Sequence, residues 1–209
     1  MIEQLELLAA NEGASWFKLS YEDQETFSKE FAAFVDTNLS EAEAYLLKQD
    51  SALFDLSTII FDAISRFSNH PEILLPLAKK VLDFPYGKED DDLYNLEVLD
   101  DIDTIELFER SPAIYMQYLD LLCSHLVPEK DPQYLLRLLP VFDLAFVQPE
   151  TASENQFIRK KWFDTIADLA NDAPLKVKLA ARKILASNKQ TRDLQPLSLV
   201  EKIRALIGL

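Results

Sequence analysis

Glycine is almost absent from this sequence, with three among its 209 residues. Phosphate-binding loops, dinucleotide fingerprints and nucleophile elbows all require several closely spaced glycines, so the sequence excludes these common enzyme sites. Cysteine occurs once, as Cys123, which rules out an intramolecular disulfide and a disulfide-stapled secreted scaffold. These absences favour an intracellular, non-catalytic protein without a cofactor.

Long apolar runs are absent as well. Residues 1–6 lack the basic and apolar regions of a signal peptide, and no apolar run approaches the roughly 20 residues that a membrane span needs. We therefore expect a cytoplasmic protein that has no membrane partner.

Positive charge is scarce, since 21 Lys and Arg stand against 36 Asp and Glu and give a formal net charge of −15. Residues 1–157 hold 10 basic against 31 acidic side chains, whereas residues 158–209 hold 11 against 5. Because a strongly negative surface repels nucleic acid and anionic lipid, the composition indicates a basic protein as the partner and argues against nucleic acid.

Apolar residues recur at helical spacing along nearly the whole chain, and no alternating segment is bounded by hairpin turns. The sequence therefore predicts an all-α fold. Four helix starts carry a capping residue followed three positions later by a carboxylate, at Ser20, Ser40, Asp103 and Ser198. The expected helices span residues 2–11, 21–37, 41–49, 52–68, 72–83, 104–109, 112–127, 132–147, 157–171, 174–187 and 199–207.

One stretch of sequence recurs where a proline opens a helix. Residues 71–82 align with residues 174–185, and residues 132–139 form a shorter third copy. The copies begin 61 and 42 residues apart, and the longer step contains an insertion at about residues 84–110. This spacing predicts a single repeat domain over residues 1–209, built from about four helical hairpins.

The last copy carries a recognisable set of residues over positions 163–187. These are Asp172 in the turn, then Val177, Lys178, Ala180, Ala181 and Leu185 in the second helix. With these residues the segment resembles a HEAT repeat, the hairpin unit of the HEAT and armadillo-like families. The resemblance implies an α-solenoid, or α-α superhelix, that binds partners through a helical face, and it implies no catalytic residue.

The insertion is the most acidic part of the chain. Ten of the side chains from residue 89 to residue 109 are acidic, and they are interleaved with apolar residues that need a core or a partner to cover them. We expect the insertion to be docked and to present an electrostatic docking surface, with Tyr86 and Tyr94 as aromatic anchors. The acidic candidates are Glu89, Asp90, Asp91, Asp92, Asp100, Asp101 and Asp103. An acidic, solvated face over a local hydrophobic cluster is the alternative.

The sequence offers little metal chemistry. An EF-hand needs a glycine at its sixth position, and no glycine follows Gly87 in the acidic run. His125 lies two residues after Cys123 on an expected helix, so the two side chains diverge and cannot easily share a metal. We expect no metal site, and we expect Cys123, Trp16 and Trp162 to be core residues.

A secondary basic patch is expected towards the C-terminus. Its members are Arg159, Lys160, Lys161, Lys178 and Arg182. Lys178 and Arg182 are i,i+4 neighbours and so share one helix face. Such a stripe suits a nucleic-acid backbone or an acidic partner, and a mixed solvated face is the alternative.

These features together indicate a protein-binding module that is not an enzyme. The leading hypothesis is an acidic adaptor or inhibitor that engages a basic protein, for example an immunity protein that neutralises a nuclease toxin. One alternative is a self-assembling scaffold, in which the basic C-terminal repeat meets the acidic middle of a neighbouring copy. Another is a helical-repeat nucleic-acid-binding protein or enzyme that uses the basic C-terminal repeat.

Overall fold

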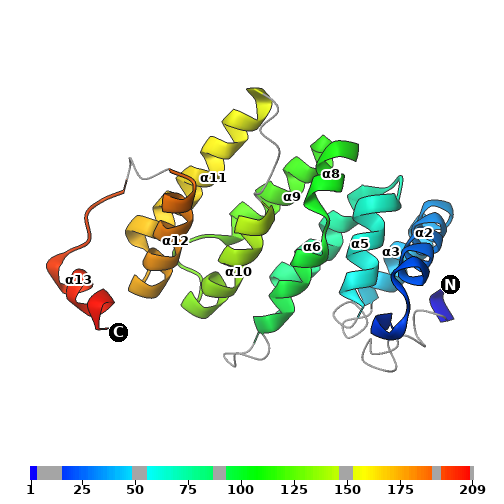
Figure 1. The fold of residues 1–209 in the computed structure, drawn as a ribbon, viewed down its shortest axis with the longest axis horizontal. Coiled ribbons are helices and arrows are strands. Elements are labelled where there is room, and N and C mark those ends of the chain that lie inside the picture. Colours follow the sequence, from blue (N-terminus) through cyan, green and yellow to red (C-terminus); the bar gives the residue numbers. More distant parts are fainter. Residues whose placement is uncertain (4–15, 49–55, 87–92, 146–152, 190–193, 208–209) are drawn as a thin grey trace. The chain divides into compact units, whose positions relative to one another are not determined.

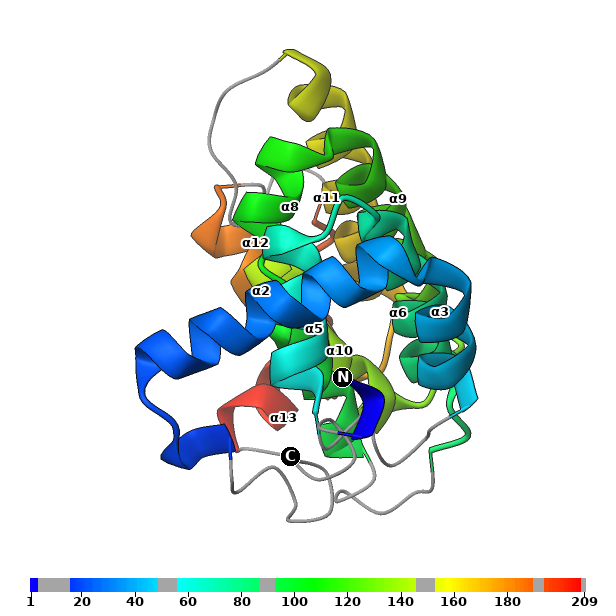
Figure 2. The same cartoon turned by 90° about the vertical axis from the view of Figure 1, so that its right-hand side faces the viewer.

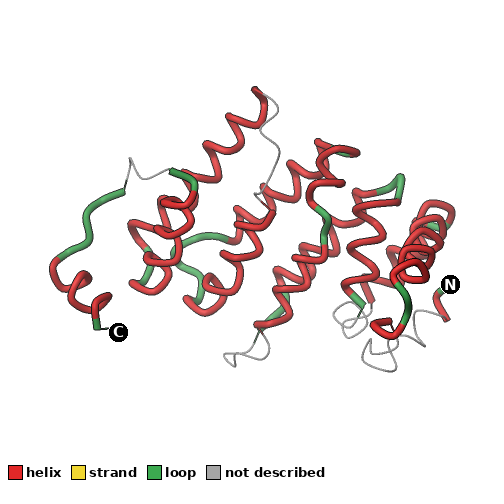
Figure 3. The backbone as a smooth tube through the Cα atoms, viewed as in Figure 1, coloured by secondary structure: helices red, strands yellow, loops and turns green. Residues whose placement is uncertain are grey.

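The computed structural model describes residues 1–3, 16–48, 56–86, 93–145, 153–189 and 194–207. Helices joined by short loops account for this part of the chain, and no strand occurs among these residues (Figure 3). The all-α fold predicted from helical periodicity is therefore confirmed for the residues described.

The chain divides into two compact units, Met1–Leu121 and Leu122–Leu209, here called unit 1 and unit 2. The boundary falls within helix α9 (Pro112–His125). Unit 1 has 8 basic against 26 acidic side chains, whereas unit 2 has 13 against 10. The two units therefore differ in the sign of their net charge, −18 for unit 1 and +3 for unit 2. The single repeat domain expected from the sequence stays a prediction.

Unit 1 is built around helix α5 (Ser57–Phe67), whose residues Ile59, Ile60, Ala63 and Ile64 are all buried. A helix that is apolar on most of its surface needs neighbours on several sides. Helices α2, α6, η2, η3 and α8 all pack against α5, and Figure 2 shows α2 crossing it. The bounds of the other elements are η1 (Trp16–Lys18), α2 (Tyr21–Thr37), α3 (Leu39–Lys48), η2 (Pro71–Ile73), α6 (Leu74–Asp83), η3 (Tyr94–Asp101) and α8 (Thr104–Arg110).

The described part of the acidic insertion, residues 93–110, is docked on the core, as expected, but it contains a helix that the sequence analysis did not predict. Its Leu93, Leu96, Leu99 and Ile102 are all at most 3% exposed, and helix η3 packs against α5 and α6. Leu96 and Leu99 lie within η3, where three residues per turn of a 3-10 helix place them on one face, and Leu93 and Ile102 flank the helix at the same spacing. The regular apolar spacing therefore explains why an acidic segment folds here.

The capping residues explain where most helices begin. Ser20 accepts a hydrogen bond from the backbone N–H of Asp23 at 3.2 Å, and Ser198 forms a complete capping box. The prediction for Ser40 is wrong, because α3 begins at Leu39. The carbonyl of Asn38 accepts from the third and fourth residues after it, at 3.0 and 2.9 Å. A single residue thus ends α2 and starts α3, which leaves Ser40 inside the helix.

Unit 2 contains helices α10 (Pro132–Ala145), α11 (Ser153–Asp172), α12 (Leu175–Ser187) and α13 (Leu199–Leu206). Helices α11 and α12 form a hairpin, and α10 packs against α12 (Figure 1). The core of unit 2 includes Ile166, Leu169, Val177, Ala181 and Leu185, each fully buried.

Three further core assignments are confirmed. Trp16 is 5% exposed, Trp162 is 3% exposed and Cys123 is 7% exposed. The Trp162 ring packs edge-on against Phe142 at 6.2 Å. These residues therefore contribute to packing, as the sequence analysis expected.

Candidate functional site

Unit 1 has an open acidic hollow of about 380 Å³ where η3 meets α8 and α5. The residues that line it are Asp62, Asp100, Asp101, Ile102, Asp103, Thr104 and Ile105. Three of the acidic residues predicted from the sequence, Asp100, Asp101 and Asp103, therefore lie at one site, together with Asp62 from α5. We call this site the acidic hollow.

The local backbone explains why these carboxylates gather. Ile102 has an extended conformation (φ −75°, ψ 113°) and its side chain is 3% exposed. Because side chains alternate along extended backbone, burial of Ile102 turns its neighbours Asp101 and Asp103 away from the core. The buried apolar residue thus sets the direction of the two acidic ones.

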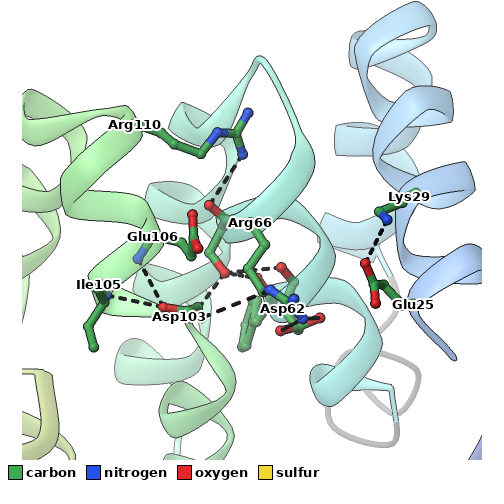
Figure 4. Close-up of polar contacts among 10 residues, drawn as sticks. Glu25, Lys29, Asp62, Arg66, Asp103, Ile105, Glu106 and Arg110 are labelled. Atoms are coloured by element: carbon green, nitrogen blue, oxygen red, sulfur yellow. Dashed lines mark hydrogen bonds and ion pairs between the residues drawn. The ribbon is translucent and has the colours of Figure 1, made fainter. Parts of the chain in front are cut away.

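Hydrogen bonds fix two of these carboxylates. Asp101 Oδ2 accepts from the Ser57 hydroxyl at 2.5 Å. Asp103 Oδ1 caps α8 by accepting from the backbone N–H groups of Ile105 and Glu106 at 3.1 and 3.0 Å (Figure 4). The Asp103 N–H itself donates to the Ser65 hydroxyl of α5 at 3.0 Å. The acidic hollow is therefore preorganised by bonds to α5 and to the start of α8.

Arg66 is the cation at the edge of the acidic hollow. Its Nη1 atom lies 3.2 Å from both carboxylate oxygens of Asp62, and its Nε atom lies 4.0 Å from Asp103 Oδ2 (Figure 4). Burial raises the pKa of Asp62, and Arg66 opposes this rise while Asp103 and Asp101 add to it. Among the described residues, one guanidinium therefore contacts two of the carboxylates that line the site.

The Asp100 carboxyl in the acidic hollow has a raised pKa. Desolvation by the surrounding protein, then the charges of Asp101 and Glu97, raise its pKa from 3.8 to about 6. Among the residues that the structure describes, no cation and no hydrogen-bond donor partners the Asp100 carboxylate. A cation brought close to it would relieve this repulsion.

Two exposed, partly apolar side chains border the carboxylates. Ile105 lines the acidic hollow and is 49% exposed, while Tyr21 of α2 is 71% exposed. Asp62 and, to a smaller extent, Tyr21 raise the pKa of the Arg66 guanidinium, so the tyrosine lies near this cation. An aromatic group next to charge is a common composition for an interface hot spot.

The sequence analysis missed Asp62, Arg66 and Tyr21. Asp62 and Arg66 are spaced i,i+4 and form an ion pair along α5, so their sequence spacing was a usable signal. Nothing in the sequence linked this pair to the insertion about forty residues later, because only the packing of η3 and α8 on α5 brings them together.

The two tyrosines proposed as anchors do not line the acidic hollow as far as the structure describes them. The Tyr86 hydroxyl donates to the Val81 carbonyl at 2.6 Å, and its ring lies 5.1 Å from that of Phe84, at the end of α6. Tyr94 begins η3, and its side chain lies outside the description. The acidic residues Glu89, Asp90, Asp91 and Asp92 also fall outside the described residues.

The basic residues of unit 2 hold the chain together at its C-terminal end. Lys178 pairs with Glu201 of α13 at 2.9 Å. Arg182 donates from Nε to the Ala170 carbonyl at 3.0 Å and from Nη2 to the Gln195 carbonyl at 2.6 Å. Two members of the predicted basic patch thus tether the segment that leads to α13.

The other members of the predicted basic patch lie on α11. Lys160 and Lys161 are exposed, and the side chain of Arg159 lies outside the description. Lys178 and Arg182 are engaged within unit 2, and the five-residue basic patch stays a prediction.

Unit 2 also has a smaller hollow of about 290 Å³ between α10 and α12. Asp143 lines it, and burial raises the pKa of this carboxyl while Lys183 opposes the rise. The buried His125 is hydrogen-bonded through Nδ1 to the Tyr134 hydroxyl at 3.1 Å. Within the described residues, no group of three or more His, Cys, Asp or Glu side chains is arranged to hold a metal ion.

Comparison of this chain with known proteins found no match. The chain matches no family model, no curated protein and no solved structure. Over the part of the chain that the structure describes, no helix is long and apolar enough to cross a membrane.

Proposed function

We propose that this chain is a non-catalytic protein-binding module whose acidic hollow docks a basic protein. The hollow would receive a Lys or Arg side chain, and the rest of the partner's basic surface would face the negative charge of unit 1. An adaptor or an inhibitor would both work in this way, and an immunity protein against a nuclease toxin is one concrete form. We also infer that the helical hairpins stack as a HEAT/armadillo-like solenoid, which the repeated prolines support.

The observation that carries the proposal is the convergence of four carboxylates in one hollow, with the Arg66 guanidinium at its edge. Asp62, Asp100, Asp101 and Asp103 line one hollow, and Arg66 contacts only the first and last of them. Ionised carboxylates held close together repel one another, as the raised pKa of Asp100 indicates. A cation from a partner would remove this repulsion without any rearrangement of the hydrogen-bonded frame.

Two exposed side chains near the edge of the hollow would add short-range apolar contacts to the binding of a partner. Exposed Ile105 and Tyr21 can be covered by the partner, which contributes apolar burial at the centre of the contact. The charge of unit 1 contributes at longer range by steering a basic partner, so the association rate should fall as salt rises.

The test is capture of partners from a nuclease-treated native lysate by the wild-type chain and by a D100N/D101N variant. Asn at both positions removes charge while leaving an oxygen that can accept the Ser57 hydrogen bond. We expect a basic protein that is captured in stoichiometric amount by the wild type, weakened by the variant, and released by about 0.5 M salt.

The matched control is E30Q/E41Q, which removes the same charge from two exposed positions on α2 and α3. If the control weakens capture as much as D100N/D101N does, general charge and not the acidic hollow binds the partner. A partner whose capture is insensitive to salt would also contradict the proposal.

A further inference from the structure

Helix α13 presents an apolar face that no described residue buries. Leu199, Val200, Ile203, Leu206 and Ile207 are between 50% and 85% exposed, and α13 has no buried residue at all. Residues spaced by three, four and seven positions share one side of a helix. The C-terminal helix is therefore amphipathic, with its apolar side open to solvent.

Several polar contacts hold α13 and the segment before it in this position. Lys178 pairs with Glu201 at 2.9 Å, and the capping box of Ser198 and Glu201 closes the first turn. Arg182 and Asn171 bind the carbonyl and the N–H of Gln195 in the preceding segment, at 2.6 and 3.0 Å. Because a helix of eight residues is marginal by itself, a partner that covers its apolar face would stabilise it.

The border of this face is cationic. Lys202 and Arg204 are exposed on α13, and in the described structure neither has a carboxylate partner. Arg204 also lines an adjoining apolar hollow of about 350 Å³ at the start of α10 and α12. The other residues of that hollow are Pro132, Gln133, Leu136, Pro174, Leu175 and Lys176. A surface that fits α13 must therefore combine apolar side chains with negative charge.

Unit 1 of this protein has such a surface. Its net charge is −18, its acidic hollow is lined by the exposed Ile105, and the exposed Tyr21 lies near Arg66 at the edge of the hollow. A second α13 would fit less well, because two copies of the helix would bring Lys202 and Arg204 of each together. Charge complementarity thus selects unit 1 over another α13 as the occupant.

We propose that α13 docks on the acidic hollow of a second copy of this chain, so that copies associate head to tail. The proposal rests on the function proposed above, since it names the partner of that same hollow. A contact between two different surfaces of one chain does not close on itself, so it builds open chains of copies whose length rises with concentration.

The test uses two complementary variants of the full chain and sedimentation velocity at about 0.15 M salt. I203E/L206E changes two exposed positions of α13 and removes its ability to dock, whereas D100K/I105K changes two exposed positions of the acidic hollow and removes its ability to accept. We expect the wild type to form oligomers that lengthen with concentration. Each variant by itself should remain at the 23.9 kDa of one chain.

An equimolar mixture of the two variants gives the decisive result. One intact α13 and one intact acidic hollow remain in the mixture, so we expect dimers of twice the chain mass and nothing larger. Matched controls are A113E/Q117E on α9 and E30K/A33K on α2, which make the same kinds of change at exposed positions. Both controls should assemble as the wild type does, and circular dichroism should show that every variant is folded.

Three outcomes would overturn the proposal: a wild type that is monomeric at every concentration, a D100K/I105K variant that still assembles, or a mixture that stays monomeric. The second of these would indicate pairing of α13 with α13.

Titration of a lysine-rich peptide onto the wild type and D100K/I105K separates this inference from the proposed function. Peptide binding that the variant abolishes supports the acidic hollow as a basic-ligand site even where the copies do not associate.

Discussion

A cation at the acidic hollow would stabilise the ionised form of Asp100, whose pKa is raised. The titration of Asp100 therefore makes protein stability depend on pH. A pKa raised from 3.8 to about 6 means that the folded protein holds this proton more tightly than the unfolded chain does. Ionisation of Asp100 therefore destabilises the fold, fully above about pH 6, and this cost declines as the pH falls from 6 towards 3.8.

We predict that D100N raises the melting temperature at pH 7.5 and does so much less at pH 4, close to the unfolded pKa of 3.8. The expected gain in unfolding free energy at pH 7.5 is about 1 kcal/mol, because solvent at this exposed position screens most of the repulsion. Thermal melts at the two pH values measure the effect. E30Q removes an equal charge from an exposed position on α2 and should show no such dependence on pH. Equal gains from D100N at both pH values would contradict the assignment.

At the scale of elements, helix η3 joins the acidic insertion to the core. Leu96 and Leu99 are at most 1% exposed and belong to the face with a period of three residues. We predict that L96A lowers the free energy of unfolding by about 2–5 kcal/mol, as expected for a large-to-small change in a packed core. Urea denaturation measures it. L47A, at a position 36% exposed, should cost much less, and equal losses would mean that η3 is not docked as described.

The attachment of α13 depends on one carboxylate. The Lys178 side chain, then the backbone and hydroxyl of Ser198, lower the pKa of Glu201 from 4.5 to about 2. Since the folded pKa is depressed, the stabilisation is complete above about pH 4.5 and is lost as the pH falls towards 2.

We predict that E201Q reduces the protection of α13 amides from hydrogen exchange at pH 7, on the order of fivefold, because it removes the ion pair and weakens the capping box. The global unfolding midpoint should hardly change, since α13 has no buried residue. The control is K202Q, an exposed neighbour whose loss should leave the exchange of α13 as it is in the wild type. Unchanged protection in E201Q would show that other contacts hold the helix.

The helices whose starts the sequence predicted best are those with a capping residue at the N-terminal end. Ser20 and Asp103 each cap a helix where the sequence places it. The sequence did not predict η3 because its apolar residues recur every third position, which matches neither the period of an α-helix nor that of a β-strand. The acidic hollow was predicted in part: the run from Asp100 to Asp103 is visible in the sequence, whereas Asp62 joins it only through tertiary packing.

At the scale of the whole molecule, the proposed solenoid makes a prediction about size. A compact globule of this length has a radius of gyration of about 17 Å, and a row of stacked hairpins has a larger one. We expect small-angle X-ray scattering of the I203E/L206E variant, chosen to suppress association, to give a value clearly above this. A radius near 17 Å would indicate that the hairpins fold back into a globule.

The three-residue period of η3 also restricts how this segment can change in length. Each residue of a 3-10 helix turns the chain by about 120°, with a rise of about 2 Å. Insertion or deletion of one residue between Leu93 and Leu99 would therefore rotate Ile102 out of the core and carry Asp101 and Asp103 away from the acidic hollow. Insertion or deletion of three residues would restore the direction of these side chains, because it adds or removes one full turn, but it would move the following residues by about 6 Å along the helix. Natural or designed variants of this segment should therefore tolerate length changes only in multiples of three.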